Sequence, residues 1–328
     1  MSKISINLSP NQPVLITKTS SLVENKLTTV DSIEPVPDDV KTSTSFLVSK
    51  TIFKSSLISF NSLWITGSWI TLWVGKTYNI KDIEDMLEKH SSIKGIFVTY
   101  HETATGVVNN LEQLGNLTKN TDCLLIADCI SGMVVQEFHL DEWGVDCAVA
   151  SSQKGFLLPP GLSFVALSDK AKKALEHSNI PKYYWDYRKY FHYFYNKSEQ
   201  PFTPAISIVV ALQAALRQLL NKGLVQIIEN KQSIRKYAEE KFKDLGFTLF
   251  IEDESIRGNV LVPVIVPEDI DGSKLTALID ERYNFTVAGG MSHYAGKMLR
   301  VGIIGEITKR EIDLLIEYIQ EIIPECKK

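Results

Sequence analysis

Apolar and polar stretches alternate along residues 80–167 in a way that predicts helices between short strands. Apolar residues at helical spacing on a charged background, beginning with Ile80 and Ile83, predict an amphipathic helix over residues 80–90. Short apolar runs rich in β-branched residues predict buried strands, with a second helix between the first two. The expected strands cover 93–100, 123–127, 145–150 and 162–167, and the second helix covers 110–120. This order is typical of βαβ units, so we expect an α/β fold whose mostly parallel sheet has helices on both faces.

The remaining pattern predicts a second, smaller unit. Apolar periodicity predicts helices over 205–220, 227–245, 275–283 and 309–323, and strands over 248–251, 260–266 and 299–304. We therefore expect a large domain over 51–221 and a C-terminal α+β domain over 222–328. Residues 1–50 are rich in Ser and Thr without a clear period, and we expect them to form an irregular N-terminal segment.

Composition narrows the choice of partners. The 328 residues include 35 Lys and Arg against 39 Asp and Glu, a net charge of −4. This balance gives no electrostatic footprint for nucleic acid or an anionic membrane, so we expect neither partner. The uncharged stretch 55–75 has the length of a membrane span, but five Ser, two Thr and Asn61 make a globular core its expected place.

The four cysteines have neither the spacing of a metal site nor that of a disulfide framework. We expect no metal and a reducing compartment, the cytoplasm. The sequence shows no clear targeting signal, and peroxisomal and mitochondrial locations stay open as alternatives.

Polar residues follow three of the predicted strands where open α/β sheets place their ligands: Thr103, Asp128 and the pair Gln153-Lys154. A carboxylate that closes an apolar strand needs a cation or a hydrogen-bond donor, and a half-buried lysine can act as a nucleophile. Together they suit pyridoxal phosphate, which offers a cationic ring nitrogen and an aldehyde that reacts with an amine. Taken singly, a strand-end Asp is more often a helix cap or an Asx turn, and a single Lys is usually a solvated surface group.

Four segments in order carry a resemblance to a known family. HETATGV at 101–107, LLIAD at 124–128, SSQKG at 151–155 and PPGLS at 159–163 resemble the class V pyridoxal-phosphate aminotransferases, in particular the alanine–glyoxylate and serine–glyoxylate (serine–pyruvate) branch. The resemblance continues through Thr203-Pro204 to GKMLRVG at 296–302 and covers roughly residues 76–323. It implies the aspartate aminotransferase-like fold, known as fold type I.

The resemblance also implies roles for individual residues. Lys154 matches the lysine that forms a Schiff base with pyridoxal phosphate and later moves a proton, and Asp128 matches the carboxylate that keeps the ring nitrogen protonated. Thr103 and Gln153 match positions that contact the cofactor, and Ile130 matches one that packs on its ring.

Two further matches concern the partner subunit and the substrate. Thr203 matches a threonine that reaches the cofactor phosphate of the neighbouring subunit, which implies a homodimer with shared active sites. Arg300 matches the arginine that binds the substrate α-carboxylate, for which its planar fork of donors is suited. The implied reaction moves an amino group from alanine or serine to glyoxylate or pyruvate.

Two alternatives stay open. The family's Ser-Gly-Thr turn, which binds the cofactor phosphate, is expected near residue 26 and has no counterpart there. A non-catalytic or weakly active relative would explain this difference. A cysteine desulfurase-like lyase would need a mobile nucleophilic thiol, but the cysteines lie in or beside predicted strands or in the C-terminal tail.

Overall fold

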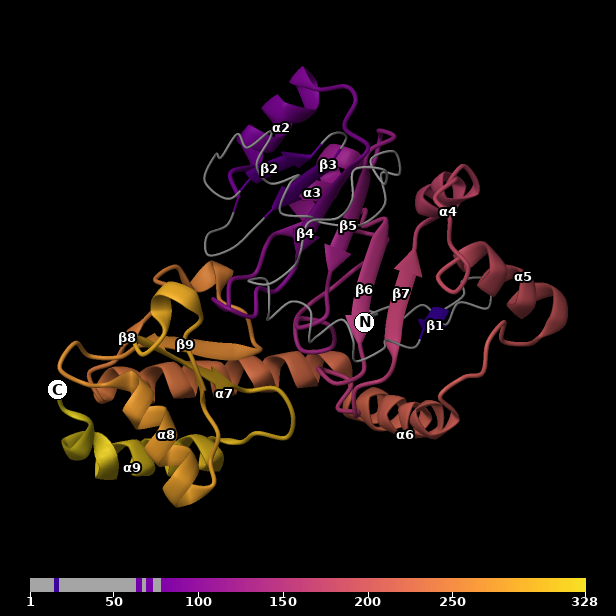
Figure 1. Ribbon diagram of the computed structural model, residues 1–328. Coiled ribbons are helices and arrows are strands. Elements are labelled where there is room, and N and C mark those ends of the chain that lie inside the picture. The colour runs from indigo at the N-terminus through magenta and orange to yellow at the C-terminus, as the bar shows by residue number, and fades with distance from the viewer. Residues whose placement is uncertain (1–14, 18–62, 67–68, 73–77) are drawn as a thin grey trace, which may run out of the picture.

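The computed structural model describes residues 15–17, 63–66, 69–72 and 78–328, and a seven-stranded mixed sheet forms the centre of the larger part (Figure 1). The order is β1-β7-β6-β5-β4-β3-β2, and β3, β4, β5 and β6 run parallel. Strand β2 is antiparallel to β3, β7 to β6, and β1 to β7. The strands are β1 Leu15–Thr17, β2 Leu63–Thr66, β3 Trp69–Leu72, β4 Gly95–Thr99, β5 Leu124–Asp128, β6 Cys147–Ser151 and β7 Ser163–Leu167.

The helices of this part begin where side chains satisfy free backbone donors. Asn79, Asn110, Ser168 and Asp186 each accept a hydrogen bond from the first turn of the helix that follows. The next helix begins after Pro204 without such a cap. They are α2 Ile80–Lys89, α3 Leu111–Thr118, α4 Asp169–Glu176, α5 Tyr187–Lys197 and α6 Ile206–Lys222.

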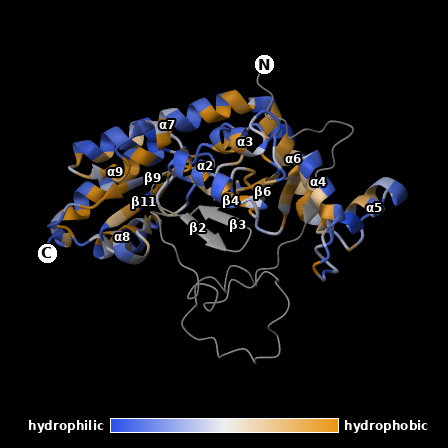
Figure 2. Ribbon diagram, turned by 90° about the horizontal axis from the view of Figure 1, so that it is seen from above, coloured by the Kyte–Doolittle hydropathy of each residue, from blue (hydrophilic) through white to orange (hydrophobic). Residues whose placement is uncertain are grey.

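The smaller part has a four-stranded antiparallel sheet in the order β10-β11-β9-β8, with helices packed against it. Figure 2 shows that helices α7 and α9 alternate hydrophobic and hydrophilic residues along their length, as helices do when one face packs on a core. The strands are β8 Thr248–Leu249, β9 Leu261–Ile265, β10 Ala288–Gly289 and β11 Met298–Gly302. The helices are α7 Leu224–Asp244, α8 Gly272–Tyr283 and α9 Lys309–Ile322, with short 3₁₀ turns at Glu254–Ile256, Ser292–Tyr294 and Ile323–Cys326.

Two hydrophobic clusters accompany the two sheets. The buried members of the first end at Leu219 and those of the second begin at Ile234, so the change of core falls within the first half of α7. Among the described residues, no single helix is long and apolar enough to cross a membrane. The pair α6 and α7 passes that test only together, bends by 80° at its break, and contributes Leu212 and Ile234 to the cores.

The structure confirms the predicted α/β fold with parallel strands, and each helix and strand predicted between residue 80 and the C-terminus is present within a few residues of its expected bounds. Two strands, β2 and β3, lie in the uncharged stretch expected to belong to a globular core. In the segment expected to be irregular, Leu15–Thr17 forms a strand and the other residues lie outside the described part of the chain. The pattern analysis missed helices α4 and α5, and the domain boundary near residue 222 stays a prediction.

Candidate active site

Three loops that follow parallel strands meet at one end of the large sheet. Asp128 is the last residue of β5, Thr103 lies in the turn after β4, and Lys154 follows the end of β6 at Ser151. Since β4, β5 and β6 are neighbours and run parallel, these residues leave the sheet at the same edge. Glycines allow the loops to approach closely: a Cβ at Gly155 would lie 2.1 Å from the backbone oxygen of Met133.

The Asp128 carboxyl is held by the loop that follows it. Its Oδ1 accepts a hydrogen bond from the backbone N–H of Ile130 at 2.9 Å. Solvent reaches this side chain, but the surrounding protein raises the pKa of Asp128 above its ordinary value, an effect that the bond from Ile130 partly offsets. No ion pair to Asp128 is found among the described residues, so a cationic group beside it would be stabilised.

Lys154 is half-buried, and its backbone is fixed by a turn. Its carbonyl oxygen accepts a hydrogen bond from Leu157 N–H at 2.9 Å, and Leu157 itself has a left-handed φ of 58°. Within the described ranges the Lys154 ammonium forms no ion pair. Its charge lowers the pKa of the buried His101, so the amine and this imidazole are close enough to interact.

Thr103 joins the loop after β4 to the loop after β5. Its hydroxyl lies 2.7 Å from the Ser131 hydroxyl, next to the half-buried Ile130. Glu102 orders the same turn by accepting a hydrogen bond from Ala104 N–H at 2.9 Å. The predicted cofactor contacts Thr103, Asp128 and Ile130 are therefore parts of one connected surface.

Arg300 reaches this surface from the small sheet. Its Nη1 donates to the Thr103 carbonyl oxygen at 3.1 Å and its Nε to the Gly289 carbonyl oxygen at 2.8 Å. Burial lowers the pKa of Arg300, and the nearby Glu102 opposes this effect. A guanidinium has five N–H donors, so the two described bonds leave donors for an anion. No carboxylate within the described residues forms an ion pair with Arg300.

Four residues around these loops have buried polar atoms without a hydrogen-bond partner among the described residues. They are both ring nitrogens of His101, the hydroxyls of Thr105 and Ser151, and Oε1 of Gln153. Such atoms cost free energy unless a ligand or water satisfies them, so their concentration here indicates a binding site. Sequence reasoning named Gln153 as a site residue but not the other three, although all of them lie within the motifs that it used.

Thr203 lies apart from this cluster. It is exposed between α5 and α6, and no hydrogen bond joins it to the other candidates in the described structure. Its assignment to a neighbouring subunit stays a prediction. The place where the phosphate-binding turn was expected, near residue 26, lies outside the described residues.

The cysteines do not provide a nucleophile. Cys123, Cys129 and Cys326 are buried and Cys147 is half-buried. Burial raises the pKa of all four, that of Cys147 to about 12, so their thiolates are scarce at neutral pH. The described residues also contain no group of three or more His, Cys, Asp or Glu side chains that could hold a metal ion.

Comparison with known proteins supports the resemblance. The family model "Aminotransferase class-V" matches residues 15–315. The chain is 30% identical over 259 residues to a serine–glyoxylate aminotransferase of Arabidopsis thaliana, covering 78% of this chain and 63% of the relative. It is 30% identical over 254 residues to a protein of a Synechococcus species named "Soluble hydrogenase, small subunit", covering 76% of this chain and 65% of the relative.

The structural comparison gives the same family. The crystal structure of an alanine–glyoxylate aminotransferase from a Nostoc species superposes with a TM-score of 0.72 at 28% identity, covering 76% of this chain and 66% of that one. The chain spans less than two thirds of the length of these curated relatives. Because the family model matches most of the sequence, the chain belongs to the class V aminotransferase family.

Proposed function

We propose that this protein is a pyridoxal-phosphate-dependent transaminase that moves an amino group from a small amino acid, alanine or serine, to glyoxylate or pyruvate. The observation that carries the proposal is the arrival of Asp128, Lys154 and Arg300 at one edge of the large sheet, Arg300 through its bond to Thr103. The amine can react with the cofactor aldehyde, and the carboxylate can stabilise a cationic ring. The guanidinium can bind the carboxylate of an amino acid.

The residues present fit pyridoxal phosphate. When bound, the cofactor supplies an aldehyde that takes up an amino group and a ring that accepts electrons from the substrate. Asp128, without an ion-pair partner in the described structure, would stabilise a protonated ring nitrogen. Gln153, whose buried Oε1 has no hydrogen-bond partner within the described ranges, and the Thr103 hydroxyl would contribute polar contacts, and Ile130 an apolar one.

Lys154 Nζ is the group that would attach the cofactor and move a proton. An amine can attack an aldehyde or accept a proton only while it is unprotonated. A second cation beside it would disfavour the protonated amine and so hinder it from accepting a proton. Burial lowers the pKa of the neighbouring His101 to about 4, so that imidazole is neutral at neutral pH. His101 therefore does not place a second positive charge beside Lys154.

Arg300 would select substrates that carry an α-carboxylate. The hydrogen bonds to Gly289 and Thr103 orient its planar fork, and a carboxylate can accept two parallel bonds from such a fork. We assign alanine or serine and glyoxylate from relatives whose names carry these substrates, and pyruvate from the resemblance to the serine–pyruvate branch. The cytoplasmic location expected from the sequence stays a prediction.

We also propose a homodimer with shared sites, on the strength of exposed apolar surface near Thr203. Large apolar or aromatic side chains in α5, in α6 and in the segment before α5 are exposed by 41–74%. Large exposed apolar patches mark protein interfaces. These side chains are Ile180, Tyr183, Trp185, Phe194, Tyr195, Ile206 and Val210.

The alternative is a relative that has the fold without the activity. Its support is the absence of a recognisable phosphate-binding turn in the sequence. Asp128 and Lys154 form no ion pair, and several buried polar atoms have no partner, in the part of the chain that the structure describes. These groups speak against a scaffold protein, which gains nothing from leaving them unsatisfied.

The test is an amino-transfer assay on the full chain supplied with pyridoxal phosphate. Alanine or serine is mixed with glyoxylate, and glycine is measured. We expect glycine formation by the wild type, loss of at least about a thousandfold in Lys154→Ala, and no loss in the exposed control Lys173→Ala. Absence of glycine with every donor, or equal rates in the wild type and Lys154→Ala, would refute the proposal.

A further inference from the structure

A short connecting segment, residues 256–259, attaches the small sheet to the turn that carries Thr103. Gly258 N–H donates to the Gly106 carbonyl oxygen at 2.9 Å, and Val108 N–H donates to the Ile256 carbonyl oxygen at 2.8 Å. Val107 and Arg257 form an antiparallel bridge between these two bonds. The turn after β4 is thus paired by backbone hydrogen bonds with a segment that belongs to the other part of the molecule.

The same segment also binds the loop after β5. Asn259 donates from its backbone N–H to Gln136 Oε1 at 3.1 Å and from its side chain to the Val135 carbonyl oxygen at 3.3 Å. A Cβ at Gly258 would lie 2.0 Å from Nε2 of His101, so this approach requires glycine. The connecting segment therefore contacts two of the three loops of the candidate active site.

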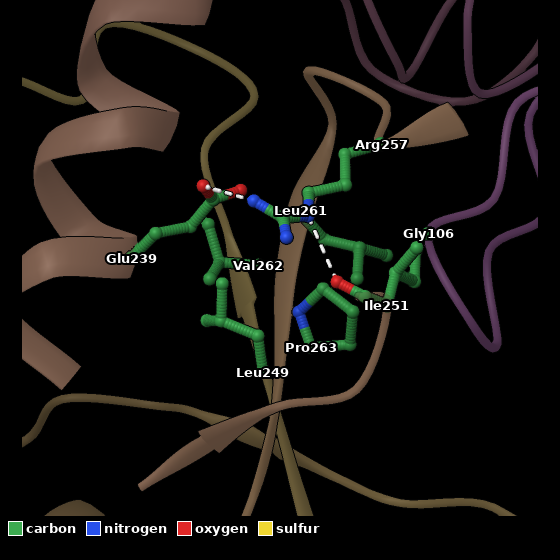
Figure 3. Close-up of a pocket in the computed structure, with 8 residues that line it drawn as sticks. All are labelled: Gly106, Glu239, Leu249, Ile251, Arg257, Leu261, Val262 and Pro263. Atoms are coloured by element: carbon green, nitrogen blue, oxygen red, sulfur yellow. Dashed lines mark hydrogen bonds and ion pairs between the residues drawn. The ribbon is translucent and has the colours of Figure 1, made fainter. Parts of the chain in front are cut away.

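A buried charged triad, consisting of Arg235, Glu239 and Arg257, fixes the connecting segment to α7. Glu239 binds Arg235 at 2.6 Å and Arg257 at 3.0 Å, and the three side chains are exposed by only 2–13%. Figure 3 shows the Arg257 guanidinium between Glu239 and the carbonyl oxygen of Ile251, which it binds at 2.8 Å. Arg257 also donates to the Glu252 carbonyl oxygen, and Glu239 is the carboxylate that neutralises its charge. Removing one member of such a triad strands a buried charge, so Glu239 stabilises Arg257 in this position.

The triad lies beside a small cavity at which the turn packs against the strand next to Arg300. Gly106 of the turn and Leu261 and Pro263 of β9 line this cavity together with Glu239 and Arg257 (Figure 3). Pro263 is the register partner of Arg300 on β11. The position of the connecting segment consequently sets how the Thr103 turn meets Arg300, whose Nη1 donates to the Thr103 carbonyl oxygen.

We propose that Glu239 is a positioning residue of the active site: through Arg257 and the connecting segment it holds the Thr103 turn against Arg300 and so sets the geometry in which the α-carboxylate is bound. Glu239 itself touches neither substrate nor cofactor in this proposal. The proposal rests on the proposed function for the role of Arg300, but the attachment of the turn is a property of this chain that is measurable without activity.

The experiment compares Glu239→Gln with Glu240→Gln, which changes the exposed neighbour on the same helix. Hydrogen exchange of the full chain measures the backbone amides of Val108 and Gly258, with the amides of α9 as an internal reference. Steady-state kinetics on the cofactor-loaded protein separates KM for the amino acid from kcat. We expect Glu239→Gln to lose at least about tenfold of the protection at Val108 and Gly258 and to raise KM at least about tenfold, with kcat within about threefold of the wild type. Glu240→Gln should match the wild type in both measurements.

Three results would overturn the proposal: unchanged protection at Val108 and Gly258 in a folded Glu239→Gln protein, lost protection with unchanged KM, or equal effects of Glu240→Gln. If Glu239→Gln does not fold, the apolar triple variant Arg235→Met/Glu239→Leu/Arg257→Met replaces it, because replacing all members of a buried charged triad leaves no charge stranded. The triple variant supports the proposal if its KM rises and overturns it if its KM stays that of the wild type. A wild type without transaminase activity refutes the proposed function, and the exchange measurement then still decides whether Glu239 holds the Thr103 turn in place.

Discussion

His101 follows β4, which ends at Thr99, and is only 1% exposed. Neither of its ring nitrogens has a hydrogen-bond partner among the described residues. Burial, together with the nearby charge of Lys154, lowers the pKa of His101 from 6.5 to about 4. The sequence contained the histidine but not this environment, because the glycines that pack around it, Gly132 and Gly258, come from two other segments of the chain. The strand-end residues Asp128 and Lys154 were predictable, because their positions follow from local pattern alone.

The lowered pKa predicts a specific sensitivity to acid. Between pH 6.5 and about 4 the unfolded chain binds a proton at His101 that the folded chain does not, so the free energy of unfolding falls by about 3 kcal/mol across this window. Urea denaturation at a series of pH values measures it. His101→Gln should lose this part of the pH dependence, whereas the exposed control His90→Gln should keep it. Parallel pH profiles of His101→Gln and the wild type would contradict the assignment.

The geometry of Arg300 predicts that a charge-conserving change is harmful. Arg300→Lys keeps the charge but loses the fork that binds the Thr103 and Gly289 carbonyl oxygens and that, in the proposed function, would bind the substrate carboxylate. We expect kcat/KM for the amino acid to fall about tenfold to a hundredfold, mainly through KM. Steady-state kinetics tests this, with the exposed Arg310→Lys as the matched control. Wild-type kinetics in Arg300→Lys would show that Arg300 does not bind the carboxylate.

At the scale of elements, helices with one apolar stripe and strands made of a short apolar run were predictable. Helix α2 has such a stripe, strands β4, β5 and β6 are such runs, and the structure contains all four close to their expected bounds. Helix α5 is aromatic on several faces, with Tyr190 buried but Phe194 and Tyr195 exposed, so it lacks the stripe by which a helix is recognised. Helix α4 has the sequence DKAKKALE, in which most residues are charged and Leu175 is the one large apolar side chain, so its apolar signal is weak.

Gly115 of α3 lies in close contact with the loop before β6, so we expect its substitution to destabilise the protein. A Cβ at Gly115 would lie 1.5 Å from the carbonyl oxygen of Trp143, a contact that only movement of the helix can relieve. Gly115→Ala should therefore destabilise the protein by about 1–3 kcal/mol despite the better helix propensity of alanine. Thermal unfolding measures the effect, and Gln113→Ala on the exposed face of the same helix is the control. An unchanged or higher melting temperature for Gly115→Ala would contradict this packing.

At the scale of the whole molecule, the proposed dimer predicts that the exposed apolar side chains of α6 are buried between two subunits. We expect light scattering to give twice the chain mass of 36.9 kDa for the wild type. The double variant Ile206→Glu/Val210→Glu should shift the protein toward monomer, because burying two carboxylates in an interface is costly. Met291→Glu, at an apolar residue that is 55% exposed outside this surface, should stay dimeric. A monomeric wild type, or a double variant that dimerises as well as the wild type, would contradict the dimer.

The sequence motifs and the structure together make Lys154 the residue on which the functional account depends, since Asp128 and Arg300 have their proposed roles only around a cofactor bound to that amine. The direct measurement is to incubate the full chain with pyridoxal phosphate, reduce with borohydride, and identify the modified lysine by peptide mass spectrometry. The account predicts that the label lies on Lys154 at about one per chain and that alanine or serine added before reduction diminishes it. A label spread over exposed lysines, or equal labelling of Lys154→Ala, would contradict the account.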